Sequence, residues 1–137
     1  MQLDYGGFSK NGINQFKNGI ITIVKYKDLE IGLEYEPNSI RHGHYLPCGY
    51  GHIRGIKGFD GMALDCYLHP DLLDSNIDHK PIFAITQMKR YGDEFDEYKV
   101  MLGFDDIIDA ELTYKKCMPT WKFGGIREIK YEDLWAL

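Results

Sequence analysis

The chain has 137 residues, of which 44% are hydrophobic and 27% are charged, and its formal net charge at pH 7 is −5. This length and composition indicate a globular protein with one domain of ordinary size and exclude a disordered chain. The acidic balance excludes a general attraction to nucleic acid, and the longest apolar run, Ile20 to Val24, is much shorter than the roughly 20 residues that cross a membrane. Because no secretory signal is visible, we expect a cytoplasmic protein.

The first part of the chain predicts an arm, two strands and a long loop. Residues 1–19 are rich in Gly, Asn and Lys and are expected to form an N-terminal arm, ahead of a single domain at 20–137. Residues 20–26 carry many β-branched side chains, and apolar and polar residues alternate from 29 to 35, so a hairpin of two strands is predicted. From Pro37 to about Gly61 the chain is rich in Gly, His and Pro, which indicates a binding loop.

The second part predicts further short strands and one main helix. Strands are expected at 62–68, 82–88 and 97–104, with a loop from Met88 to Asp96, and a last strand at 126–130. A helix is expected from Asp105 to about Lys116, because acidic residues at its start and lysines at its end suit the helix dipole. Residues 131–137 predict a short C-terminal helix. This order favours a mainly β (α+β) fold, a small and mostly antiparallel barrel with one main helix packed on it.

Two aspartates stand on either side of Gly61 in the stretch KGFDGMALDCYL, residues 57–68. Side chains alternate along a strand, so Asp60 and Asp65 can converge only if Asp60 lies in the turn before the strand, which Gly61 permits. Asp65 lies among apolar residues and needs a partner when it is buried. That partner is either a cation or a basic or phenolic side chain.

A second acidic group lies in the stretch YGDEFDEYK, just before Lys99. It contains Asp93, Glu94, Asp96 and Glu97. One interpretation is a solvated acidic loop. The other joins this group to the two earlier aspartates around a hard cation such as Mg²⁺, which usually sits on one or two carboxylates together with phosphate oxygens.

Basic and phenolic side chains form a third set of candidates: Arg41, Lys99, Tyr45 or Tyr50, Tyr114 and Lys115. Arginine binds planar oxyanions with two hydrogen bonds, and lysine and tyrosine supply further donors. Each could instead be an ion-pair partner on the surface, and Tyr114 has the helical spacing of a core residue. The three cysteines lack a C-x-x-C spacing and the H-x-H pair lacks a third ligand, so a zinc site and a disulfide framework are not expected.

Several motifs follow one another in the chain: E-x-x-P-x-S-x-R-x-G from Glu34 to Gly43, Y-G-H-I at 50–53, K-G-F-D-G-M-A-L-D at 57–65, F-D-E-Y-K-V-M-L-G-F at 95–104, and Tyr114-Lys115. In this order they resemble the soluble family I inorganic pyrophosphatases. They are more closely similar to the pyrophosphatase-like domain of phage and mobile-element polyvalent proteins. The spacing from Glu34 to Pro37 is one residue longer than in the family's E-x-P form.

The resemblance implies an OB-like barrel and Mg²⁺-assisted attack of water on pyrophosphate. The residues that match the family motifs are Asp60, Asp65 and Glu97 as metal ligands, Arg41, Tyr50, Lys99, Tyr114 and Lys115 as phosphate-binding residues, and Glu34 in an outer ring. The implied partner is a small phosphorylated molecule, with a homo-oligomer or a protein partner left open. A phage-encoded protein would act in the host cytoplasm.

Met62 departs from the family signature, because it stands where the signature has an aspartate that helps to deprotonate the attacking water. A thioether is no base at neutral pH, and general-base assistance typically contributes 10² to 10⁴ in rate. Asp93 or Asp96 could replace it, so the expected catalytic residues are these two with Asp65. Alternatively, Met62 belongs to the core and the protein is a catalytically silent relative, such as a phage accessory protein that binds a phosphorylated ligand or a protein partner.

Overall fold

The computed structural model describes residues 19–137, so the expected arm lies outside the described residues apart from its last position. The main sheet consists of β1 (Thr22–Tyr26), β2 (Leu29–Tyr35), β5 (Gly49–Lys57), β6 (Ala63–Leu68), β7 (Ile82–Lys89), β8 (Glu94–Leu102) and β9 (Phe123–Ile129). A separate hairpin is formed by β3 (Ile40–Arg41) and β4 (His44–Tyr45). The helices are α1 (Ile107–Cys117) and the 3₁₀ turns η2 (Pro70–Leu73), η3 (Arg90–Gly92), η4 (Thr120–Lys122) and η5 (Tyr131–Ala136).

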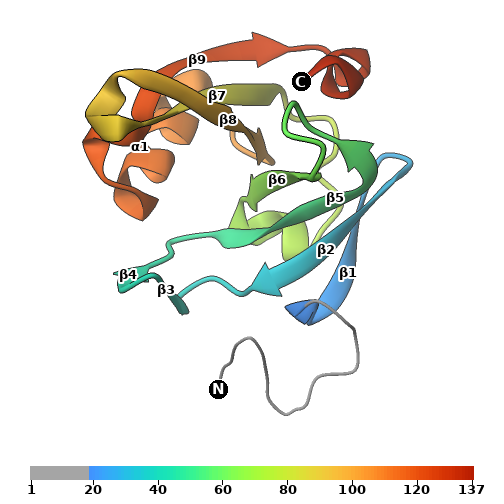
Figure 1. The fold of residues 1–137 in the computed structure, drawn as a ribbon. Coiled ribbons are helices and arrows are strands. Elements are labelled where there is room, and N and C mark those ends of the chain that lie inside the picture. The colour runs from blue at the N-terminus through green and yellow to red at the C-terminus, as the bar shows by residue number, and fades with distance from the viewer. Residues whose placement is uncertain (1–18) are drawn as a thin grey trace.

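The mainly β class is confirmed, but the expected closed barrel is wrong. The sheet has seven strands in the order β1-β2-β5-β6-β8-β7-β9, so β1 and β9 are its two edges (Figure 1). All pairs are antiparallel except β6 and β8, which run parallel. Strand β8 pairs with β6, and β7 and β9 continue the sheet beyond β8. The sheet therefore ends at β9 and does not return to β1, as it would in a barrel.

The local predictions hold where a segment is either strictly alternating or strictly helical. The β1–β2 hairpin forms as expected, and α1 begins after Asp106, whose side chain accepts a hydrogen bond from the Asp109 amide at 2.8 Å. The last strand and the C-terminal helix also form, the latter as a 3₁₀ helix. Among residues 19–137, no helix is long and apolar enough to span a membrane.

The expected loop from Pro37 to Gly61 is wrong in its second half, because β5 occupies it. Residues 49–51 are all buried, so this strand shows no alternation of apolar and polar side chains. Gly51 faces the neighbouring strand so closely that a Cβ atom there would lie 2.1 Å from the carbonyl oxygen of Gly32. The glycine therefore marks a close approach of two strands, whereas in isolation it resembles a loop residue.

The expected loop from Met88 to Asp96 is also too long. The pairing of β7 with β8 continues to Lys89 and Glu94, whose side chains form an ion pair at 3.4 Å. Only the turn between these residues is left outside the strands. Oppositely charged residues that face one another across two strands stabilise the strand pairing, so a stretch rich in charged residues can still form strands.

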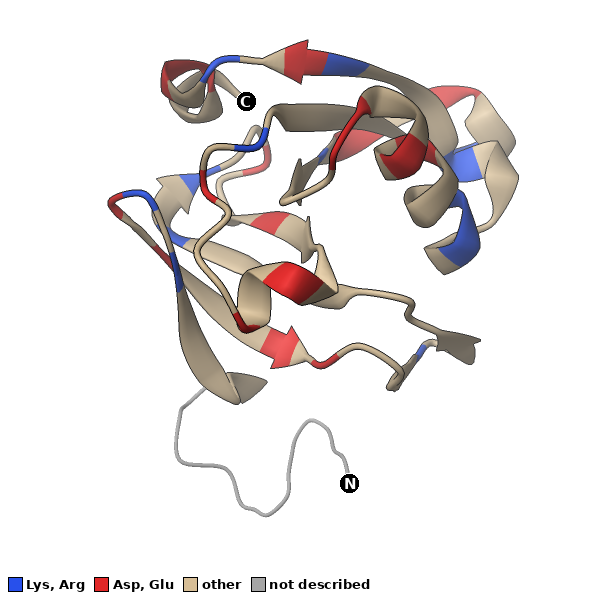
Figure 2. Cartoon of the chain, turned by 180° about the vertical axis from the view of Figure 1, so that it is seen from behind, with Lys and Arg blue, Asp and Glu red and all other residues tan. Residues whose placement is uncertain are grey.

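The sheet separates two hydrophobic cores. Along β6 and β8, Leu64, Cys66 and Val100 belong to one core, whereas Tyr67 and Met101 belong to the other, as expected for side chains that alternate between faces. Helix α1 covers the second face with Ala110, Tyr114 and Cys117, and we call this the helix face. By the same alternation, Tyr50, His52, Asp65, Gln87 and Lys99 belong to the helix face. Charged residues occur on most elements of the chain (Figure 2).

Candidate functional site

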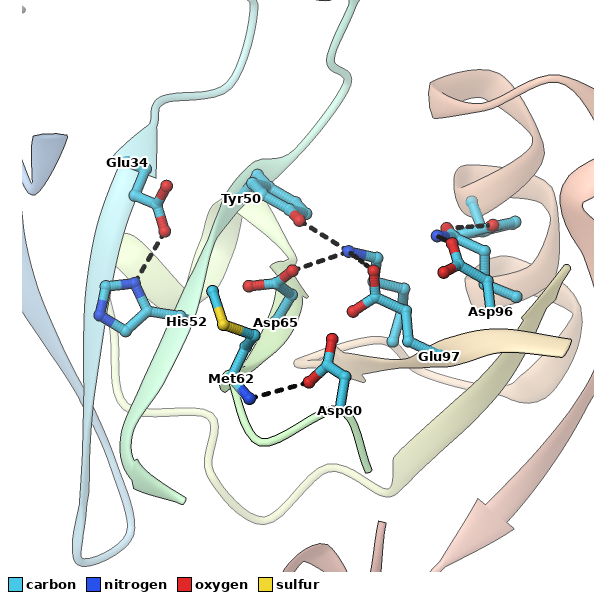
Figure 3. A network of polar contacts seen from close by, with 11 residues as sticks. Glu34, Tyr50, His52, Asp60, Met62, Asp65, Asp96 and Glu97 are labelled. Atoms are coloured by element: carbon cyan, nitrogen blue, oxygen red, sulfur yellow. Dashed lines mark hydrogen bonds and ion pairs between the residues drawn. The ribbon is translucent and has the colours of Figure 1, made fainter. Parts of the chain in front are cut away.

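Lys99 is the centre of the polar cluster on the helix face. Lys99 is 3% exposed, and its Nζ lies 2.8 Å from Asp65 Oδ2, 2.9 Å from Tyr50 Oη and 3.4 Å from Glu97 Oε2. Strands β5, β6 and β8 are neighbours in the sheet, which brings these side chains together from distant parts of the sequence. Figure 3 shows Tyr50, Asp65 and Glu97 converging on one point. One ammonium group therefore serves two carboxylates and a phenol.

The charge states of this cluster follow from burial and from its neighbours. Burial by itself lowers the pKa of Lys99. The Asp65 and Glu97 carboxylates raise it by a larger amount, so the pKa of Lys99 lies above its usual value. Burial raises the pKa of Glu97, partly offset by Lys99, and it raises the pKa of Tyr50 well above its usual value. At neutral pH Lys99 is therefore an ammonium and Tyr50 a neutral phenol, and both can donate hydrogen bonds.

Asp60 lies in the turn before β6, as the sequence predicts. Its Oδ1 accepts a hydrogen bond from the Met62 amide at 2.9 Å, and the Gly58 amide donates to the Met62 carbonyl oxygen at 2.7 Å. Gly61 has a φ of +80°, which a residue with a side chain rarely adopts. In Figure 3 the Asp60 carboxylate points toward the same space as those of Asp65 and Glu97.

Met62 does not belong to the core, so that interpretation is wrong. Met62 is 67% exposed, because β6 begins only at Ala63 and Met62 remains in the turn. Strand alternation therefore does not apply to it. Figure 3 shows Met62 in the turn that carries Asp60, to which its amide is bonded.

The residues present fit a metal ion only in part. Asp60, Asp65 and Glu97 offer hard oxygen donors, which suit Mg²⁺. However, in the described part of the chain no three Asp, Glu, His or Cys side chains are close enough to hold a metal ion by themselves. The Lys99 ammonium also supplies positive charge to two of the three carboxylates. This donor set fits a cation that is completed by ligand oxygens better than one held by protein groups alone.

Arg41 reaches the cluster from the β3–β4 hairpin. Its guanidinium carbon lies 3.9 Å from the centre of the Tyr50 ring and 5.8 Å from that of Tyr35. The positive charge of Arg41, followed by burial and by Lys122, lowers the pKa of His42. The guanidinium therefore stacks on the Tyr50 ring, a cation–π contact that helps to hold it in place.

Tyr114 and Asp96 form a second network on the helix face. The Tyr114 hydroxyl donates to Gln87 Oε1 at 2.6 Å, and Gln87 Nε2 donates to Asp96 Oδ2 at 3.1 Å. Tyr114 and Gln87 are buried, and burial raises the pKa of Tyr114. Within residues 19–137 no hydrogen bond joins Tyr114 or Asp96 to Lys99, although the charge of Lys99 partly offsets the effect of burial on the pKa of Tyr114.

Two expected residues lie outside both groups. Lys115 Nζ bonds to Glu111 at 2.7 Å and lies 4.5 Å from the centre of the Phe123 ring. Asp93 is exposed at the end of η3. The structure thus brings together Asp60, Asp65, Glu97, Lys99, Tyr50 and Arg41, and leaves Lys115 and Asp93 apart from them.

The structure also adds two polar residues to the expected ones, His52 and Gln87. His52 bonds through Nδ1 to Glu34, the residue expected in an outer ring, at 2.7 Å, and Gln87 bridges Tyr114 and Asp96. Tyr67 is fully buried, with its ring 4.9 Å from that of Tyr50, and among the described residues its hydroxyl has no hydrogen-bond partner. The signal for His52 was its place two residues after Tyr50, but it depends on knowing that β5 is a strand.

A model of the family described as Inorganic Pyrophosphatase matches residues 9–136, a span that includes every residue of both networks. No curated protein and no solved structure matches the chain.

Proposed function

Because the chain belongs to the inorganic pyrophosphatase family, we propose that it hydrolyses pyrophosphate or a related diphosphate in the cytoplasm with the help of Mg²⁺. The family generally depends on a metal ion and acts on phosphorylated small molecules. The observation that carries the proposal is the buried Lys99 ammonium, which bonds to Asp65 and Tyr50, together with Arg41, which stacks on the same Tyr50 ring. Two cationic side chains in contact with the same Tyr50 ring suit a ligand with several negative oxygens.

In this proposal Arg41 donates hydrogen bonds to phosphate oxygens. Lys99 does so with the N–H that faces Glu97, its most distant partner at 3.4 Å, once Glu97 turns toward the metal. Tyr50 holds Lys99 in place with its hydroxyl and supports Arg41 with its ring. A bound Mg²⁺ would be held by Asp60, Asp65 and Glu97 and would neutralise charge on the leaving phosphate. Tyr114 is proposed to act through Gln87, and Lys115 to bind phosphate only if it leaves Glu111.

Hydrolysis also requires a group that accepts a proton from the attacking water. Met62 cannot do this, since a thioether is not a base at neutral pH. Asp96 is the better candidate of the two expected aspartates, because Gln87 orients its carboxylate, whereas Asp93 is exposed at the end of a turn. Asp65 is proposed to orient Lys99 as well as to bind the metal.

The alternative is a catalytically silent member of the family that binds a phosphorylated ligand or a protein partner, for example as an accessory protein of a phage. The observation that favours it is Met62, which is 67% exposed in the turn that carries Asp60. Position 62 has no side chain that can act as a base, whereas the side chains proposed to bind an anion, Arg41 and Lys99, are present.

The test is phosphate release from pyrophosphate in the presence of Mg²⁺. We expect turnover by the wild type and its loss in Asp65→Asn, with Asp28→Asn on the β1–β2 turn as a control that should retain it. A shift in Tm on addition of Mg²⁺ and pyrophosphate would report binding independently of turnover. Absence of phosphate release together with a clear shift in Tm would favour the silent alternative. Absence of both would contradict the proposal.

A further inference from the structure

Tyr67 carries a buried hydroxyl group that no hydrogen bond satisfies. The residue is fully buried, and within residues 19–137 its Oη is the one buried side-chain polar atom without a hydrogen-bond partner. Buried polar groups are hydrogen-bonded in the large majority of cases, because burial removes their bonds to water. A phenylalanine would fill nearly the same volume without this cost, so packing does not explain the hydroxyl.

Tyr67 packs against Tyr50, the residue that also contacts both cations of the site. The two tyrosines are cross-strand neighbours in the β5–β6 pair, and their ring centres are 4.9 Å apart. The centre of the Tyr50 ring lies 3.9 Å from the guanidinium carbon of Arg41 and 5.3 Å from Nζ of Lys99. Tyr67 thus packs on the same ring as the two side chains that are proposed to bind phosphate.

The hydroxyl of Tyr67 is a neutral donor close to these two positive charges. Burial raises its pKa well above the usual value, and the charges of Lys99 and Arg41 act in the opposite direction with smaller effect. At neutral pH the group therefore keeps its proton and can donate it in a hydrogen bond. A neutral donor beside two cations suits an anionic oxygen, which attracts all three groups.

The ring of Tyr67 is held in a fixed orientation. It meets the Tyr50 ring at an angle of 62° and the Tyr114 ring at 89°, with the Tyr114 ring centre 5.8 Å away. Edge-to-face contacts of this kind are favourable for aromatic pairs. A donor on such a ring loses little conformational freedom when it binds, which favours affinity.

The β3–β4 hairpin, which carries Arg41, is separate from the main sheet. It forms a two-stranded sheet of its own. The Asn38 amide donates to the Leu46 carbonyl oxygen at 2.7 Å and the Leu46 amide donates to the Ser39 carbonyl oxygen at 2.9 Å, so these bonds stay within the segment. The hairpin can therefore shift together with Arg41 without breaking the strand pairing of the main sheet.

We propose that the Tyr67 hydroxyl donates a hydrogen bond to an oxygen of the bound diphosphate, beside Arg41 and Lys99. This inference rests on the proposed function and adds a ligand-binding residue to it. On binding, the hairpin shifts with Arg41 and admits a phosphate oxygen to the buried hydroxyl. The ligand then supplies the acceptor that no described protein group provides.

The test uses Tyr67→Phe, which removes only the hydroxyl. Two quantities are measured for the full chain: Tm without ligand, and the affinity for methylenediphosphonate, a diphosphate analogue that cannot be hydrolysed, by calorimetric titration with Mg²⁺. We expect Tm to rise by at least about 3 °C, because an unpaired buried group is removed. We expect the affinity to fall about 10- to 100-fold, because a hydrogen bond to a charged group is lost.

Tyr26→Phe is the matched control. Tyr26 is also fully buried, but it lies in the other core and its hydroxyl donates to the Lys80 carbonyl oxygen at 3.3 Å. Removing this hydroxyl should lower Tm and leave the affinity for methylenediphosphonate unchanged. The two variants should therefore shift Tm in opposite directions.

The outcomes separate this inference from the proposed function. An affinity unchanged by Tyr67→Phe, or a Tm that falls as in Tyr26→Phe, would overturn the role of Tyr67 even if the wild type hydrolyses pyrophosphate. A loss of affinity in Tyr67→Phe, without phosphate release by the wild type, would support that role and contradict the hydrolysis. No binding of methylenediphosphonate by the wild type would overturn both. Near-ultraviolet circular dichroism shows whether a loss of affinity reflects a loss of folding.

Discussion

The Nζ atom of Lys99 lies 2.8 Å from Oδ2 of Asp65, and this contact joins the parallel neighbours β8 and β6 on the helix face of the sheet. The sequence leaves the partner of Asp65 open between a cation and a basic or phenolic side chain, and in the structure Lys99 is that partner. The ammonium is almost fully buried, so the loss of either partner would leave the other charge without compensation in the protein interior. It joins the candidate site to the stability of the fold.

Lys99→Met should destabilise the protein substantially. The variant keeps most of the side-chain volume but leaves Asp65 and Glu97 without their shared cation. Removing one partner of a buried ion pair costs up to about 5 kcal/mol, and we expect about 2–4 kcal/mol because 27% of the Asp65 side chain is exposed. Urea unfolding measures this difference. The matched control is Lys25→Met, which breaks the exposed pair with Glu30 and should cost less than about 1 kcal/mol. Equal effects of the two variants would contradict a buried role for Lys99.

Met62→Asp should increase phosphate release if a missing base limits the reaction. The exposed position of Met62 accepts an aspartate without a cavity or a buried charge, so the fold should persist. General-base assistance typically contributes 10² to 10⁴ in rate, and we expect at least a tenfold gain because the new carboxylate is not optimally placed. Met62→Leu controls for the loss of the thioether and should show no gain. A rate unchanged by Met62→Asp would place the limiting proton transfer elsewhere.

Gln87→Leu should destabilise the protein by leaving two groups without their partner. Gln87 joins the Tyr114 hydroxyl to the Asp96 carboxylate, and leaving a buried polar group unpaired costs about 1–3 kcal/mol. Tyr114→Phe removes only the hydroxyl and should cost about 0.5–1.5 kcal/mol. Since both changes break the same hydrogen bond, the double variant should cost less than the sum of the single ones. Additive costs would show that the bond is not formed in solution.

The stability of the protein should depend on pH through Glu97. Burial raises the pKa of Glu97, so the folded state binds this proton more tightly than the unfolded chain does. The resulting stabilisation is complete below the unfolded pKa of about 4.3 and is lost as pH rises through the higher folded pKa. The free energy of unfolding of the wild type, minus that of Glu97→Gln, should therefore fall as pH rises above about 4. A chelator excludes metal effects. A difference that rises with pH would be the opposite sign and would mean that Lys99 outweighs burial.

The accuracy of the sequence predictions depends on how local the responsible interactions are. The β1–β2 hairpin and α1 were predictable, because alternation in one case and capping by Asp106 in the other act within a few residues. Strand β5 was not, since its glycine at position 51 is explained by a contact with Gly32 on another strand. The alternative that places Met62 in the core fails because the predicted strand begins one residue before β6 does.

The sequence by itself determined the family, the mainly β class and the residue types of the site, because ordered motifs and short-range periodicity survive in a linear string. Only the tertiary structure decided which of those residues meet. The Lys99–Asp65 contact spans 34 positions and depends on β8 pairing with β6, and the sheet stays open because β8 joins it there. Hydrogen bonds and ion pairs act over a few ångströms, so their partners depend on strand register and burial, which are set by the packing of the whole chain.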